Sequence, residues 1–71
     1  MATSTVVTRG VTVDKLLLGD VVWLHNRRWF LIGMQVEEYS ALKGRELHLR
    51  DSEGNAHVEF FVDFDVVTIE I

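Results

Sequence analysis

Three histidines are the side chains best suited to chemistry in this 71-residue chain: His25, His48 and His57. Neutral imidazole is a common metal ligand. If the last two share the outer face of one hairpin with Glu59, they lie close enough to hold an ion. Ordinary surface pairs, His48 with Glu59 and His57 with Arg50, explain the same residues more simply. We therefore predict no metal site and no cofactor.

Nucleophiles and catalytic carboxylates are no better placed for hydrolysis. The chain has no cysteine, and its serines fall in a tail, a loop and a turn, without the strand-to-helix elbow that exposes a catalytic serine. No carboxylate pair sits in an apolar setting that would raise a pKa, and the five glycines are isolated from one another, so no phosphate-binding loop is present. The sequence predicts a protein that is not an enzyme and takes no small-molecule substrate.

The composition predicts one small domain. Apolar residues make up 48% of the chain, which is enough for a single core. The longest apolar runs, 21–24 and 29–32, are too short to cross a membrane, and residues 1–10 lack the apolar stretch of a signal peptide. We expect a cytoplasmic protein with no membrane partner, in which a disordered tail (1–5) precedes one domain (6–71).

The strongest strand signals are two apolar segments, 21–25 and 29–37, that form a hairpin. A three-residue turn at 26–28 pairs Leu24 with Phe30 and Val22 with Ile32. It gathers one alternating stripe on the core face, made of Val22, Leu24, Phe30, Ile32, Met34 and Val36. A two-residue turn would instead place Trp29 and Leu31 on that face. We favour the three-residue turn, because the other would leave Phe30, Ile32 and Met34 outside.

A second hairpin is predicted over 45–51 and 56–62, around a turn in which Gly54 adopts a positive φ. Leu47 would face Phe60 on the inner side, and Leu49 would face Val58. Residues 6–13 form an arm or an edge strand, and 63–71 contains a closing strand. We expect an all-β fold, a small five-stranded barrel of antiparallel hairpins without substantial helix, because closure removes exposed sheet edges.

Residues 17–22 (LLGDVV), followed at once by a hairpin with Arg27-Arg28-Trp29 at its tip, resemble the opening of SH3-like small barrels. The chain is similar there to KOW-type modules and to short SH3-like proteins of actinobacteria and their phages. The resemblance covers about residues 12–36. It implies a five-stranded SH3-like barrel and an accessory protein of a phage or other mobile element. The motif describes how the first barrel strand begins and implies no activity.

The predicted register leaves an apolar surface on the outer face of the first hairpin. It consists of Val21, Trp23, Trp29 and Leu31, flanked by Arg27 and Arg28. Tryptophan and arginine are enriched where proteins bind one another most strongly. Two interpretations stay open: the arm of residues 6–13 covers this face, or the face binds a protein partner or a second copy of the chain. These six residues are the predicted partner-binding site.

Nucleic-acid binding is the alternative function. Residues 25–50 carry five basic side chains against three acidic ones. Phosphate contacts and base stacking would come from Arg27, Arg28, Lys43, Arg45 and Tyr39. The net charge of −4, with six acidic residues in 51–71, predicts weak and salt-sensitive binding at this patch. The sequence thus favours a non-enzymatic protein-binding module over a nucleic-acid-binding barrel.

Overall fold

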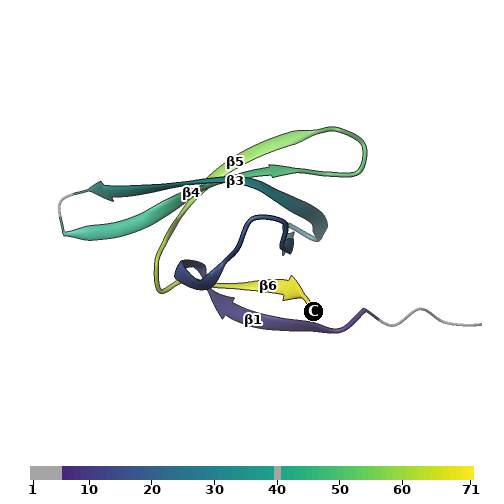
Figure 1. The fold of residues 1–71 in the computed structure, drawn as a ribbon, viewed down its shortest axis with the longest axis horizontal. Helices are drawn as coiled ribbons and strands as arrows, with labels where there is room; N and C mark the ends of the chain where they lie inside the picture. Colours follow the sequence, from purple (N-terminus) through teal and green to yellow (C-terminus); the bar gives the residue numbers. More distant parts are fainter. Residues whose placement is uncertain (1–5, 40) are drawn as a thin grey trace, which may run out of the picture.

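The computed structural model describes residues 6–39 and 41–71, and the predicted disordered tail (1–5) lies outside the described residues. The described chain forms six antiparallel strands of one sheet and one turn of 3₁₀ helix (Figure 1). These elements are β1 (Thr8–Thr12), η1 (Val13–Lys15), β2 (Val21–Leu24), β3 (Arg27–Tyr39), β4 (Leu42–Arg50), β5 (Ala56–Val62) and β6 (Val66–Glu70). The prediction of an all-β fold without substantial helix is confirmed for these residues. None of their helices is long and apolar enough to span a membrane.

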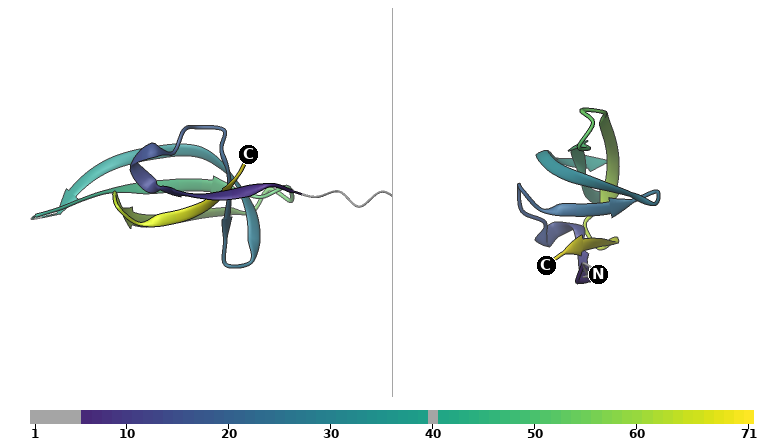
Figure 2. Two further views of the ribbon diagram at one scale, coloured as in Figure 1. Left: turned by 90° about the horizontal axis from the view of Figure 1, so that it is seen from below. Right: turned by 90° about the vertical axis from the view of Figure 1, so that its right-hand side faces the viewer.

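The sheet is open instead of closing as the predicted barrel of five strands. Its strands lie in the order β1-β6-β2-β3-β4-β5, so β1 and β5 are the two edges. Strand β6 pairs with β2 on one side and with β1, over five residues, on the other. Strand β5 pairs only with β4 among the described strands. The sheet bends strongly, with β1 and β6 below a layer of β3, β4 and β5 (Figure 1, Figure 2).

The core lies inside this bend. Its buried side chains alternate along the strands, as residues on one face of a sheet must. They are Val13, Leu16, Val22, Trp29, Leu31, Leu47, Leu49, Val67 and Ile69. The 3₁₀ turn closes one end of the core, because the backbone N–H groups of Val13 and Asp14 donate to the carbonyls of Asp65 and Asp63.

The β2–β3 hairpin has a two-residue turn, so the predicted three-residue turn is wrong. His25 and Asn26 have φ values of 53° and 61°, the left-handed conformation that a type I′ turn requires at both positions. Val22 consequently pairs with Trp29, and Trp29, Phe30 and Leu31 change face relative to the prediction. Further along β3, Met34 packs against the core as predicted. Trp29 and Leu31 are only 4% and 1% exposed, so the prediction that they point outward is also wrong. Burying an indole removes more apolar surface from water than burying an aliphatic side chain.

A β-bulge restores the alternation further along β3. The pairing shifts between Leu31 and Gly33, so Leu31 lies opposite Leu49 and Met34 lies opposite Leu47. Ile32 is the extra residue, and it is exposed. The single stripe predicted from residue 22 to residue 36 is therefore broken into two segments.

The β4–β5 hairpin is shifted by one residue from the predicted register. Leu47 lies opposite Glu59, and Leu49 lies opposite His57. The predicted inward positions of Leu47 and Leu49 are confirmed, but Val58 and Phe60 lie on the outer face. The loop sets this register, since the carboxylate of Asp51 accepts hydrogen bonds from the backbone N–H groups of Glu53 and Asn55. The predicted positive φ at Gly54 is confirmed, at 86°.

Candidate partner-binding face

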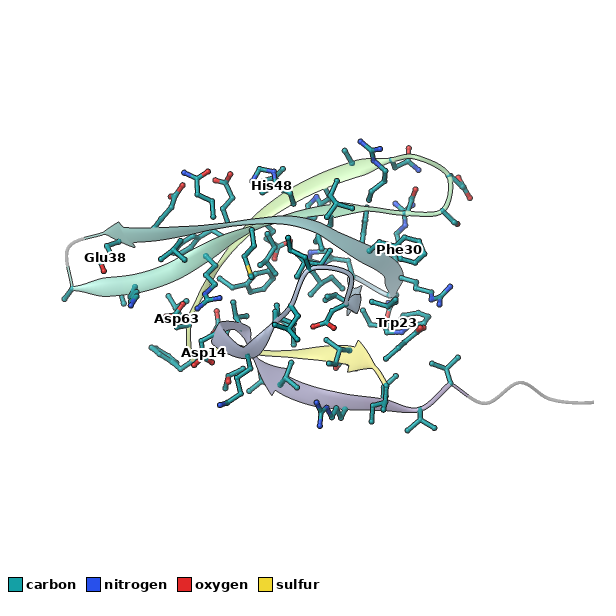
Figure 3. The ribbon with its side chains drawn as sticks, viewed as in Figure 1. Asp14, Trp23, Phe30, Glu38, His48 and Asp63 are labelled. Atoms are coloured by element: carbon teal, nitrogen blue, oxygen red, sulfur yellow. The ribbon has the colours of Figure 1, made fainter. Side chains whose placement is uncertain are left out.

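The outer side of the β2–β3 hairpin carries an exposed tryptophan among aromatic and charged neighbours. Trp23 pairs with Arg28, and Val21 pairs with Phe30, on the side opposite Val22 and Trp29. Trp23 is 36% exposed and Arg28 is exposed, whereas Val21 and Phe30 are half-buried. Figure 3 shows Trp23 and Phe30 at the same end of the molecule. We call Val21, Trp23, Arg28 and Phe30 the hairpin face.

A carboxylate from β6 fixes the two largest polar groups of this face. Arg28 donates through Nε and Nη2 to the two oxygens of Glu70, at 2.7 and 2.8 Å. The indole Nε1–H of Trp23 donates to Oε1 of the same carboxylate at 3.2 Å. The Arg28 guanidinium holds the pKa of Glu70 below its usual value, and the hydrogen bonds that Arg28 donates to Glu70 raise the pKa of Arg28. Both groups are therefore charged at neutral pH and keep one orientation.

The residues beside Trp23 in the neighbouring strands are small. Trp23 lies opposite Thr68 of β6, and Thr68 lies opposite Gly10 of β1. A Cβ atom at Gly10 would stand 3.0 Å from a methyl carbon of Val66, so a larger residue there would have to push this side chain aside. The strand at Thr8–Thr12 lies beside β6 in the sheet, not over the hairpin face.

The six residues predicted to bind a partner are divided between the two sides of the sheet. Val21, Trp23 and Arg28 lie on the hairpin face, and Trp29 and Leu31 lie in the core. Arg27, the sixth residue, lies on the inner side. It contacts Asp51, and the Arg27 guanidinium lies 4.8 Å from the centre of the Trp29 ring. The prediction missed Phe30 and Glu70. The sequence did contain a signal for the position of Phe30. Asparagine adopts the left-handed conformation readily, so His25-Asn26 could have indicated the two-residue turn that places Phe30 opposite Val21.

The basic residues predicted to contact nucleic acid do not form one patch. Arg27 pairs with Asp51, Arg28 pairs with Glu70, and Arg45 lies 3.5 Å from Asp63. Lys43 is exposed on β4, and Tyr39 ends β3, with its side chain outside the described residues. The first two arginines start the 13-residue strand β3, whereas Lys43 pairs with Glu38 near the end of that strand. Carboxylates thus already neutralise three of the four predicted phosphate contacts.

A histidine cluster lies on the inner side, at the β2–β3 turn. It consists of His25, His57 and Glu59, because the observed register of β5 turns the last two residues inward. The Nε2 atoms of both imidazoles lie 2.7 Å from Oε1 of Glu59, and these hydrogen bonds lower the pKa of the Glu59 carboxyl. The predicted surface pairs do not form: His48 lies on the outer side, with its Nε2 3.0 Å from Glu46. The two-residue turn and the loop at Asp51 bring this cluster together.

No family model matches this sequence, and no curated protein is similar to it in sequence. The fold is similar to that of a translation initiation factor eif-5a family protein from Naegleria fowleri, with a TM-score of 0.77 and 9% sequence identity. The match covers 90% of this chain and 47% of that one, so the chain spans about half the length of that protein. At this identity the likeness shows the fold alone. It supports a fold of the small β-barrel type without singling out the SH3-like, KOW-type assignment.

Proposed function

We propose that this chain is a non-enzymatic binding module whose hairpin face contacts a protein, in the first place a second copy of the chain. The observation that carries the proposal is the exposed Trp23 ring, hydrogen-bonded together with Arg28 to Glu70. Tryptophan and arginine contribute most of the binding energy at many protein interfaces. Side chains already held in one orientation lose less conformational entropy when a partner binds.

Charge favours a second copy as the partner. The Arg28–Glu70 ion pair neutralises the charge that Arg28 brings to the hairpin face, although the chain carries a net charge of −4. Two copies that meet through this face therefore do not place unpaired Arg28 charges against each other. In a two-fold dimer the same patch of each copy forms the contact, so both copies would bring an Arg28–Glu70 pair to it. Val21 and Phe30 supply the apolar part of the contact.

Nucleic-acid binding through Arg27, Arg28, Lys43 and Arg45 is the weaker alternative, since three of these cations pair with carboxylates. Phosphate would have to displace those carboxylates, which costs part of the electrostatic gain. The similarity of fold to a translation initiation factor eif-5a family protein identifies no further nucleic-acid-binding residue in this chain. The cytoplasmic location and the phage or mobile-element origin stay predictions.

Sedimentation equilibrium over a wide range of concentrations tests self-association. We expect the wild-type chain to form dimers, and we expect Trp23→Ala to weaken the dimer by about tenfold or more. Phe64→Ala is the matched control, because Phe64 is 73% exposed and lies outside the hairpin face, between β5 and β6. Its dimer should be as stable as that of the wild type.

Two results would contradict the proposal. A wild-type chain that stays monomeric at every concentration would exclude the second copy, and equal weakening by Trp23→Ala and Phe64→Ala would exclude the hairpin face. A shift assay with single-stranded and duplex oligonucleotides at low salt tests the alternative. Binding that Lys43→Ala abolishes and Trp23→Ala leaves intact would replace protein binding with nucleic-acid binding as the function.

A further inference from the structure

Two separate parts of the chain supply the histidine cluster. His25 belongs to the β2–β3 turn, and His57 and Glu59 lie two residues apart on the edge strand β5, so both point to its inner side. The three possible ligand atoms all lie within 4.8 Å of one another. One carboxylate oxygen of Glu59, Oε1, contacts both imidazoles, and the second oxygen takes no part in these two contacts.

We propose that His25, His57 and Glu59 bind a divalent transition-metal ion of the zinc type. Imidazole nitrogen and carboxylate oxygen are ligands that zinc takes in proteins, and two histidines with one glutamate leave a fourth position for water. Tetrahedral bonds of about 2.0–2.1 Å place ligand atoms about 3.3 Å apart. To admit the ion, the two contacts of 2.7 Å must lengthen slightly, and the two imidazole nitrogens, which lie within 4.8 Å of each other, must move to a similar spacing. His25 is exposed, so its ring has room to make this movement.

Packing holds two of the rings near their binding positions before any ion arrives. The His57 ring lies 5.4 Å from that of the buried Trp29, tilted by 32°, and Trp29 is itself fixed by a hydrogen bond from Nε1 to the carbonyl of Leu24. The His25 ring meets His57 edge-on, with centroids 5.7 Å apart.

The surrounding charges allow a cation at this place. The cluster supplies one negative charge, from the ionised Glu59. The neighbouring cation is Arg27, beside Trp29, and Asp51 neutralises it by a direct ion pair. A bound divalent ion would therefore meet a site whose ligands favour positive charge.

The third histidine provides an internal comparison. His48 also lies next to a glutamate, with its Nε2 3.0 Å from Glu46, but on the outer side of the sheet. In the described part of the chain, His25, His57 and Glu59 are the only group of three residues arranged to hold an ion. A histidine–glutamate pair alone gives two ligands, so we expect the His48 pair to bind zinc much more weakly.

A metal ion in the cluster would also tie the β2–β3 turn to β5, the edge strand that has one neighbour in the sheet. An ion that binds the folded chain and not the unfolded chain raises the free energy of unfolding. Zinc should therefore raise the Tm of the wild-type chain. This second readout depends on neither dimer formation nor the hairpin face.

The test uses the full chain, stripped of metal and free of any histidine tag. Calorimetric titration with Zn²⁺ and visible absorption with Co²⁺ report stoichiometry, affinity and ligand geometry. We expect one ion per chain, and we expect His25→Gln and Glu59→Gln each to weaken binding by about tenfold or more. His48→Gln is the matched control and should bind as tightly as the wild type. Neither cluster variant removes a buried apolar side chain, and both should fold.

Three results would overturn the site. The first is a wild-type chain that binds neither Zn²⁺ nor Co²⁺. The second is a loss of affinity in His48→Gln equal to that in His25→Gln. The third is unchanged binding in both cluster variants. Near-ultraviolet circular dichroism of each variant, which reports the packing of the aromatic side chains, separates a lost ligand from a lost fold. Weak binding with an unchanged spectrum supports the site, and weak binding only in misfolded variants counts against it.

Discussion

Trp23 and Trp29 lie on one hairpin and have opposite environments. Trp29 is buried, donates its indole N–H to a carbonyl of the same hairpin, and packs against His57 and Arg27. Trp23 is exposed and donates its indole N–H to Glu70, a charged residue of another strand. The buried ring completes the core, whereas the exposed ring is held in place on the surface. This contrast separates the residues that stabilise the fold from those that we propose bind a partner.

The largest expected effect comes from truncating the buried ring. Trp29→Ala should lower the free energy of unfolding by about 3–5 kcal/mol, because it leaves a cavity among Leu31, Leu49 and their neighbours. A chain of this length has a total stability of only about 4–10 kcal/mol, so the variant should be largely unfolded. Trp23→Ala should cost about 1 kcal/mol. Chemical denaturation measures both, and equal losses would mean that the two rings are not on opposite sides.

The second largest effect is expected at the β2–β3 turn, which sets the register and so decides which side of the sheet each tryptophan lies on. Asn26 has a φ of 61°, where a β-branched residue is strongly disfavoured and glycine is not. Asn26→Val should therefore destabilise the fold by roughly 1–2 kcal/mol, and Asn26→Gly should leave it nearly unchanged. Thermal unfolding of the two variants measures the difference. A valine as well tolerated as glycine would argue against the two-residue turn.

Alternation in the sequence predicted the strands and the inward positions of Leu47 and Leu49, because both follow from local period-two patterning. It did not predict the register of either hairpin. The first depends on two non-glycine residues, His25 and Asn26, both adopting the left-handed conformation. A slip of one residue at that turn exchanges Trp29 for Phe30 in the core.

Three further features depend on interactions that no local pattern reveals. The β4–β5 register follows from the carboxylate of Asp51, which binds the backbone of its own loop. The open sheet follows from pairing between β1 and β6, which are more than fifty residues apart in sequence. The histidine cluster depends on both hairpin registers at once. The metal hypothesis that the sequence analysis set aside, with His48, His57 and Glu59, shared two residues with the cluster and did not include His25.

Acidification should destabilise the inner side of the sheet, the side of Trp29, through protonation of Asp51. Hydrogen bonds from Asn55, then from the backbone of Glu53, and the charge of Arg27 hold the pKa of Asp51 below its ordinary value of 3.8. A carboxyl whose pKa is lower in the folded chain than in the unfolded chain stabilises the fold above the unfolded value. That contribution is lost as the pH falls through the folded value.

Tm measured from neutral pH down to about pH 2 checks this expectation, because that range spans the titration of such a carboxyl. The Tm of Asp51→Asn should be lower than that of the wild type at neutral pH and should fall less steeply with acid. Wild-type and variant curves that stay parallel down to the lowest pH would show that Asp51 does not carry the acid sensitivity.

The smallest effect on folding, and a selective effect on binding, is expected at Arg28. Lysine keeps the charge but cannot donate two parallel hydrogen bonds to Glu70, so Arg28→Lys releases the orientation of the hairpin face. The pair lies at the surface, where ion pairs contribute little to stability, so the Tm should change less than in Trp29→Ala, Asn26→Val or Asp51→Asn. Dimer formation should nevertheless weaken more in Arg28→Lys than in Arg9→Lys. Arg9 is the matched control, because it is exposed and lies on the side of the sheet opposite the hairpin face. A large drop in Tm, with dimerisation unaltered, would instead make Arg28 a structural residue and leave Trp23 alone to carry the contact.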